Sequence, residues 1–470
     1  MSALCCKCKK RPAVVFVQKF DPTGKNAAEA EGYCLVCAKK LGIGPVNDML
    51  EKMGIDDEQL ENMSDELTGL MESGEFFPGM PQGGNPDDPD APDGDGNEPD
   101  EPDESETRTP SVNLGSIFGN LGNFGANRQK LEERHIFNQT AEYNRKLTAI
   151  SKEAVGDRVW IAGDMAPTGL FLAPLGTATF EELVDIYTEQ AAGLEQAGVD
   201  LYVVETMMTL SDARAAVLAV RSVSDKPIFV TFTCDENGRS ISGGDVTAAL
   251  VVLQGMGIDA FGLNCSAGPE QMLPQLRRLR EYARVPLIAK PNAGMPQIVD
   301  GKAVYDCTPE EFVALIPDML RTGVAVFGGC CGTTAAHIAA LRDALDGASV
   351  TPPAPLHTDK LPAATEKLPF PLPVDVRWST VISLTADAED ALSAGQETDD
   401  PVLAVRIDDW DGVQALADFQ YLIAKPLCIV CDDGELLEAA LRVYQGRALY
   451  DGGLPDSVLL PLRGKYGLLI

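Results

Sequence analysis

The sequence lacks any apolar run of about 18 residues, which a membrane-spanning helix would need. The N-terminus, MSALCCKCKK, also lacks the apolar core of a signal peptide. Basic residues are scarce, because 38 Lys and Arg stand against 71 Asp and Glu and give a net charge of −33. Since nucleic acids and anionic lipids bind basic surfaces, we expect no nucleic acid and no membrane as partners. The phosphate-binding pattern G-x-x-x-x-G-K-[ST] is absent as well, so the chain has no P-loop for ATP.

Histidine is rare, with 3 residues, whereas cysteine is plentiful, with 12. Without a signal peptide we expect a cytoplasmic protein, where thiols stay reduced. In that compartment, clustered cysteines are metal ligands or catalytic groups more often than disulfides. The cysteines therefore become the main candidates for functional sites.

Composition divides the chain into six segments. Residues 1–45 form a small cysteine-bearing module, and 46–76 have the apolar spacing of a short helical segment. Residues 77–123 are rich in Pro, Gly and acid, which predicts a disordered linker; we favour a solvated spacer over an acidic docking motif. A Pro-rich connector at 348–374 separates a long region, 124–347, from a shorter α/β segment, 375–470.

The region 124–347 alternates short apolar runs with amphipathic helices. The six predicted strands are 158–164, 200–206, 227–234, 260–265, 286–292 and 324–331. Strands without polar alternation, each followed by a helix, predict a parallel sheet or a TIM-type barrel. The predicted fold class is thus α/β: an incomplete TIM-type (β/α) barrel with six recognisable strands, an N-terminal zinc ribbon and a C-terminal partial α/β segment.

Two pairs of cysteines mark the N-terminal module. Cys5 and Cys8 form one C-x-x-C pair, and Cys34 and Cys37 form another. Four thiolates close a tetrahedral shell, so this layout predicts a structural zinc in a ribbon rather than free thiols. Residues 1–80 resemble the N-terminal zinc-binding module of Clp-associated regulators, on the strength of CCKCKKRPAVVFV and EGYCLVCAKKLGI.

Three further cysteines follow two predicted strands of the long region. Cys265 ends the GLNC strand, and Cys330 and Cys331 end the FGGCC strand. Strand ends on one rim can bring thiols to a single metal, and three ligands leave the fourth tetrahedral position open, as in a catalytic zinc site. Glycines around the second pair permit a tight turn and the close approach of a ligand. The alternative, three buried cysteines that act only as small apolar side chains, is disfavoured by this arrangement.

Residues 124–347 resemble the homocysteine-binding barrel of cobalamin-dependent methionine synthases. The matching runs are FGANRQKL, GDMAPTG, VVETMMTLSDARAAV, GLNCSAGPE, KPNAGMP and FGGCCGTTAAHI. The resemblance implies that Cys265, Cys330 and Cys331 bind a catalytic Zn²⁺ and that Glu205 holds the substrate amino group. It also places Asn264, Gly328 and Gly329 in the substrate site. The implied reaction is zinc-dependent methyl transfer to the thiol of homocysteine, which gives methionine.

The chain departs from this family in two ways. The Asp-Gly of the family's first strand and most of its second strand are missing before FGAN, which implies reduced activity. No corrinoid-binding Asp-x-His-x-x-Gly signature is present, so a separate corrinoid protein, free methylcobalamin or another donor would supply the methyl group. Residues 375–470 weakly resemble part of a pterin-binding domain. The alternative function is a zinc-ribbon adaptor of a Clp-type protease system that carries an inactive barrel fragment.

Overall fold

The computed structural model describes residues 7–9, 15–18, 30–41, 125–172, 176–295, 297–299, 302–352, 360–378, 380–385 and 388–470. The predicted helical segment 46–76 and linker 77–123 lie outside the described residues. The chain divides into two compact units, Met1–Ser111 and Val112–Ile470. In the described part of the first unit, β1 (Val15–Gln18) pairs antiparallel with β2 (Ala30–Tyr33), and α1 (Leu35–Lys40) follows.

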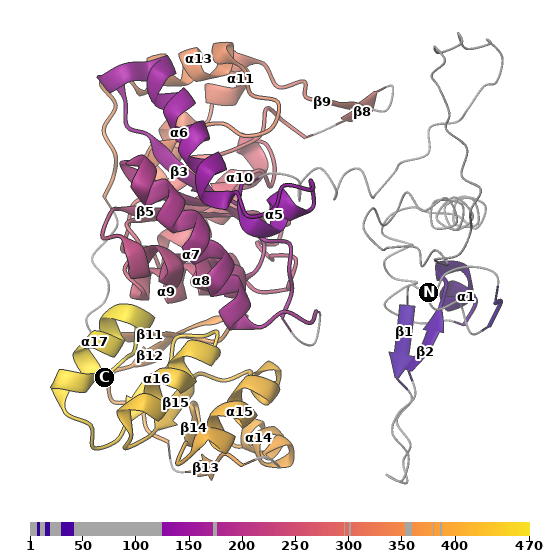
Figure 1. Cartoon of the computed structure of the whole chain (residues 1–470), viewed down its shortest axis with the longest axis vertical. Coiled ribbons are helices and arrows are strands. Elements are labelled where there is room, and N and C mark those ends of the chain that lie inside the picture. The colour runs from indigo at the N-terminus through magenta and orange to yellow at the C-terminus, as the bar shows by residue number, and fades with distance from the viewer. Residues whose placement is uncertain are drawn as a thin grey trace, which may run out of the picture. The chain divides into compact units, whose positions relative to one another are not determined.

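A six-stranded parallel sheet forms the centre of the second unit (Figure 1). Its order is β10-β7-β6-β5-β4-β3, so strands that are neighbours in space follow one another along the chain. The strands are β3 (Ala162–Met165), β4 (Leu201–Met207), β5 (Ile228–Phe232), β6 (Ala260–Asn264), β7 (Leu287–Lys290) and β10 (Val324–Phe327). The six predicted strands are therefore present; β4 has the predicted length, and the other five are shorter than expected.

Helices cover one face of this sheet. They are α5 (Arg128–Glu132), α6 (Thr140–Val155), α7 (Phe180–Ala197), α8 (Leu210–Val223), α9 (Val246–Gly255), α10 (Pro269–Arg280), α11 (Pro309–Val313), α12 (Ile316–Thr322) and α13 (Ala335–Leu345). Of these, α5 and α6 precede β3, and the others follow the strands. A short hairpin, β8 (Gln297–Val299) with β9 (Lys302–Val304), lies between β7 and α11. The helices bury the Met165, Val204 and Leu263 side of the sheet in a continuous apolar core.

The sequence pattern from about residue 128 to 154 predicts one long helix, but this prediction is wrong. The segment forms two helices, α5 and α6, and His135 and Asn138 between them have positive φ angles. His337 caps the start of α13. Its Nδ1 lies 2.9 Å from the Thr334 hydroxyl at the start of α13, and its Nε2 lies 2.9 Å from the Cys307 carbonyl.

The two edges of the sheet, β3 and β10, have no further strand partner among the described residues. On β3, Gly163 and Met165 face the helices, whereas Ala162 and Asp164 on the opposite face are exposed. On β10, Val324 is buried and Ala325 is exposed. Since the inward side chains of a closed barrel are packed, the described strands form an open sheet rather than a closed barrel.

A second, four-stranded parallel sheet forms the C-terminal part. Its order is β13-β14-β15-β16, with β13 (Val381–Ser383), β14 (Leu403–Arg406), β15 (Leu427–Val430) and β16 (Leu449–Asp451). Its helices are α14 (Glu389–Gln396), α15 (Trp410–Phe419), α16 (Gly434–Val443) and α17 (Asp456–Tyr466). The Pro-rich connector contains a hairpin of β11 (Lys360–Ala364) and β12 (Pro369–Pro373).

The apolar CIVC segment contains the buried strand β15, in which Cys428 is fully buried. The apolar YGLLI segment contributes a single bridge, between Leu449 and Leu469. No helix in the described ranges is long and apolar enough to cross a membrane.

Candidate metal centre at the strand ends

Three cysteines meet at the carboxyl ends of β6 and β10. Cys265 follows β6 directly, and the glycine turn after β10 carries Cys330 and Cys331. All three Sγ atoms lie within 4.8 Å of one another; the Sγ atoms of Cys265 and Cys331 are 3.4 Å apart, and those of Cys330 and Cys331 are 4.0 Å apart. The residues are half-buried thiols. The structure therefore brings together the three predicted ligands of the barrel region.

Unusual backbone conformations create this meeting point. Cys265 has a φ of +60°, a conformation that costs free energy for a residue with a Cβ. Gly332, with a φ of +77°, follows the adjacent cysteines, and a Cβ there would lie 2.3 Å from the Tyr305 ring. The turn can thus present two neighbouring thiols to one point, which a continuous strand could not do.

Asn292 ties the two cysteine-bearing loops together. Its amide nitrogen donates to the Cys265 carbonyl at 2.8 Å, and its amide oxygen accepts from the Cys331 N–H at 3.1 Å. The side chain is buried, so these bonds are shielded from water. Asn292 follows β7, which lies between β6 and β10 in the sheet. From this position it fixes the distance between the two cysteine-bearing loops.

Asn264, predicted to bind substrate, is fully buried beneath the thiols. Its amide oxygen accepts from the Thr206 N–H at 3.1 Å, and its nitrogen donates to the Thr206 hydroxyl at 2.6 Å. The same nitrogen lies 3.7 Å from the Cys330 sulfur. Thr206 itself has a φ of +60°, and this network holds the end of β4, including Glu205, in place.

The chemistry of the three thiols suits a soft divalent cation. The pKa of Cys331 is lowered to about 3, because the thiols of Cys265 and Cys330 donate hydrogen bonds to its sulfur, with a smaller contribution from Tyr305. The pKa of Cys265 is raised by its contacts with Cys330 and Cys331. Without a metal ion, the cluster thus favours a state in which one of the three thiols is ionised. A divalent cation would offset the repulsion among three thiolates. Three sulfur ligands that leave one position open are typical of catalytic zinc.

Charged side chains gather beside the thiols on the inward face of the sheet. Glu205 at the end of β4 forms an ion pair with Lys290 at the end of β7. Asp164 on β3 lies close enough that the charges of Glu205 and Lys290 both affect its pKa. Desolvation among protein atoms and the neighbouring Glu205 raise the pKa of Asp164 to about 7, although solvent reaches this residue along the open edge.

The predicted glycines occupy tight positions near this group. A Cβ at Gly328 would lie 3.1 Å from the Lys290 side chain, and a Cβ at Gly329 would lie 2.5 Å from that of Thr333. Sequence reasoning missed Lys290 as part of the site and gave Asn292, which it placed at a strand end, no specific role. Both lie in the KPNAGMP run, so the signal was their position at a strand end on the same rim.

The N-terminal unit has a cluster of its own. The sulfur atoms of Cys8, Cys34 and Cys37 lie within 4.8 Å of one another, and those of Cys8 and Cys34 are 3.8 Å apart. Cys5, the fourth predicted ligand, lies outside the described residues.

The sheet and its three thiols thus define an α/β domain with a cluster of three cysteines on its rim that could hold a metal ion. Residues 122–345 match the family described as homocysteine S-methyltransferase. The chain is 34% identical over 227 residues to a methionine synthase of Mycobacterium tuberculosis (strain ATCC 25618 / H37Rv), and equally so to one of Mycobacterium leprae (strain TN). Each alignment covers 46% of this chain and 19% of the relative, so the chain spans about a fifth of these proteins.

Solved structures give a weaker likeness. The metallated form of the homocysteine methyltransferase MmuM from Escherichia coli is 21% identical, with a TM-score of 0.39, and the match covers 46% of this chain and 76% of MmuM. The sequence matches confirm the predicted resemblance at the level of the domain and support a methyltransferase enzyme. The adaptor alternative gains no support from them.

Proposed function

We propose that residues 122–345 transfer a methyl group to the sulfur of homocysteine. The observation that carries this proposal is the convergence of Cys265, Cys330 and Cys331 on the rim of a domain that matches the homocysteine S-methyltransferase family. The three thiols would hold Zn²⁺. When bound, zinc lowers the pKa of a fourth sulfur ligand, so that the substrate thiol is ionised at neutral pH.

The surrounding residues hold and orient the reactants. Asn292 keeps the two ligand loops at a fixed separation, and Asn264 supports both Cys330 and the end of β4. Glu205, one residue before Thr206, would bind the substrate ammonium group. In the reaction the substrate sulfur forms a bond to the methyl carbon as the donor leaves with the electron pair of its own bond to that carbon.

The methyl donor comes from outside the chain in this proposal. A methylated corrinoid, either free methylcobalamin or a corrinoid carried by a separate protein, has the required electrophilic methyl group. The N-terminal Cys8, Cys34 and Cys37 would hold a second zinc, together with Cys5, in a structural role.

Methionine formation tests the proposal directly. Purified zinc-loaded chain is incubated with homocysteine and methylcobalamin, and methionine is measured against the Cys265→Ala variant. We expect turnover by the natural chain and none above background by the variant. Equal rates in both samples would overturn the proposal.

A further inference from the structure

Lys290 places a positive charge beside the carboxylate that would receive the substrate ammonium. Its Nζ pairs with Glu205 Oε2, and the two side chains are only 26% and 21% exposed. A second cation that approaches this half-buried carboxylate is repelled by the first and competes with it for the carboxylate oxygens, so its binding favours release of the first. This pair therefore raises the question of where the Lys290 ammonium goes when substrate arrives.

The structure keeps Lys290 next to the thiols in any case. Its backbone carbonyl accepts from the Cys265 N–H at 3.3 Å, and its side-chain stem runs past Gly328, where a Cβ would lie 3.1 Å from the Lys290 Cγ. Gly328 thus leaves room for the stem between the turn after β10 and the inward face of the sheet. A released ammonium would remain in the mouth of the site, where it needs an anionic partner.

We infer that Lys290 binds the α-carboxylate of an amino-acid thiol once Glu205 has taken its ammonium group. This inference rests on the proposed function and names the feature of the substrate that the site selects. In an α-amino acid the ammonium and carboxylate groups are attached to the same carbon. A single ligand therefore replaces the Glu205–Lys290 pair with two new pairs, one between its ammonium group and Glu205 and one between its carboxylate and Lys290. A thiol with an amine and no carboxylate would release Lys290 without giving it a partner, and would bind more weakly for that reason.

Calorimetric titration of the zinc-loaded full chain with two ligands tests this role. One ligand is homocysteine, and the other is 3-aminopropane-1-thiol, which is homocysteine without its carboxylate. The ratio of their dissociation constants measures selection for the carboxylate, and it is compared in the natural chain, Lys290→Met and Lys290→Arg. Methionine keeps the stem that packs against Gly328, and arginine keeps the charge. Zinc content and circular dichroism check that each variant is loaded and folded.

We expect the natural chain and Lys290→Arg to prefer homocysteine by about tenfold to a hundredfold, the value of one charge-assisted hydrogen bond. In Lys290→Met this preference should fall by about tenfold or more. Homocysteine loses the contact between its carboxylate and Lys290, whereas 3-aminopropane-1-thiol no longer competes with the Lys290 ammonium for Glu205. A change of equal size for both ligands would overturn the inference, since a merely structural role would affect them alike. If neither thiol binds the natural chain, the proposed function itself fails and the inference fails with it.

Discussion

At the scale of single residues, the cysteine cluster makes a prediction about metal content. Cys265→Ala removes one of the three clustered thiols of the sheet domain and leaves Cys8, Cys34 and Cys37 untouched in a separate compact unit. We expect metal analysis of the purified variant to show the loss of one of two zinc equivalents. Cys234→Ala is the matched control, because Cys234 follows the neighbouring strand β5 and lies outside the cluster. A loss of both equivalents, or of neither, would contradict the two-site interpretation.

Asn292 leads to a second prediction at this scale. Asn292→Ala removes both hydrogen bonds between the Cys265 and Cys331 loops, while all three thiols remain. Residues that support metal ligands typically contribute about tenfold to a hundredfold to metal affinity, and we expect a loss of that size. Competition with a chromogenic zinc chelator measures it. Asn138→Ala, on an exposed turn, serves as the control, and equal zinc affinity in the two variants would show that Asn292 does not position the ligands.

At the scale of elements, Arg214 joins the large sheet domain to the C-terminal part. It lies on α8 and is buried, and its guanidinium donates to the Leu441 carbonyl at 2.8 Å and to Gln445 Oε1 at 2.9 Å. The cation also lies at the last turn of α16, where it offsets the helix dipole. Arg214 therefore ties α8 to the end of α16 through hydrogen bonds that are shielded from water.

Arg214→Met should destabilise the chain by about 2 kcal/mol or more, because it leaves buried acceptors without a donor. Urea denaturation measures the change in free energy of unfolding. The control is Arg342→Met, which removes an arginine that is paired with Asp343 on the exposed surface of α13 and should cost less than about 1 kcal/mol. Similar losses in both variants would mean that the Arg214 contacts do not stabilise the interface.

The elements also show what the sequence could and could not predict. Short apolar runs between amphipathic helices predicted all six strands of the large sheet, because parallel strands buried by helices read as continuous apolar segments. The first strand was placed too early: Val159 and Trp160 are apolar but exposed, and pairing with β4 begins only at Ala162. The predicted strands are continuous apolar runs, so the sequence did not show which of their side chains point to the inward face of the sheet. The positions of Asp164 and Lys290 beside Glu205 therefore came from the structure.

At the scale of the whole molecule, the two compact units suggest a deletion. A chain that begins at Val112 keeps every described residue of the sheet domain and its cysteine cluster. We expect it to fold and to retain the methyltransferase rate of the full chain, because the N-terminal cysteines would form a closed structural site. Circular dichroism and methionine formation check the two expectations. A truncated protein that is folded but inactive would assign the N-terminal unit a part in catalysis.

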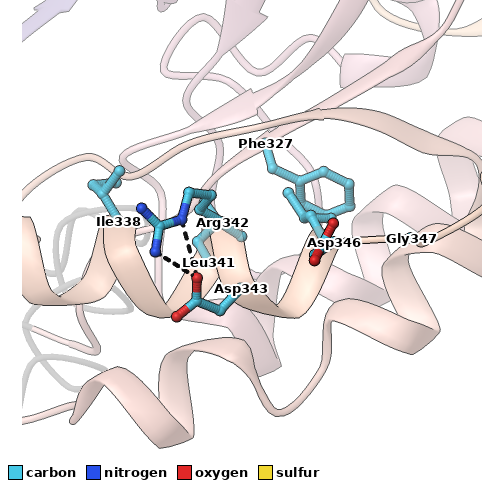
Figure 2. A pocket seen from close by; sticks show the side chains of 8 residues that line it. Phe327, Ile338, Leu341, Arg342, Asp343, Asp346 and Gly347 are labelled. Carbon is cyan, nitrogen blue, oxygen red and sulfur yellow. Dashed lines mark hydrogen bonds and ion pairs between the residues drawn. The ribbon is translucent and has the colours of Figure 1, made fainter.

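The open edges of the large sheet lead to the last prediction. Next to β10, a hollow of about 670 Å³ is lined by Phe327, Ile338 and Leu341 and by the exposed Arg342–Asp343 pair (Figure 2). At the other edge, Trp160 is 82% exposed, and α6 exposes Leu147 and Ile150. Apolar side chains at both edges, together with the exposed residues Ala162 and Ala325 on the two edge strands, are the surfaces that two more strand–helix units would cover in a closed barrel.

The turn that carries Cys330 and Cys331 follows β10, whose outer side has no strand partner in the described part of the chain. A site displaced by about 1 Å can lose on the order of a hundredfold in rate. Replacing residues 111–123 with two complete strand–helix units, the first bearing Asp-Gly, should therefore raise homocysteine affinity and turnover, and should also raise the urea midpoint. The same graft on Cys265→Ala separates the effects, because it should gain stability without activity. If the grafted natural chain is more stable yet no more active, the open edge does not limit the reaction, and the cause of slow turnover lies in the thiol cluster or in the Glu205–Lys290 pair.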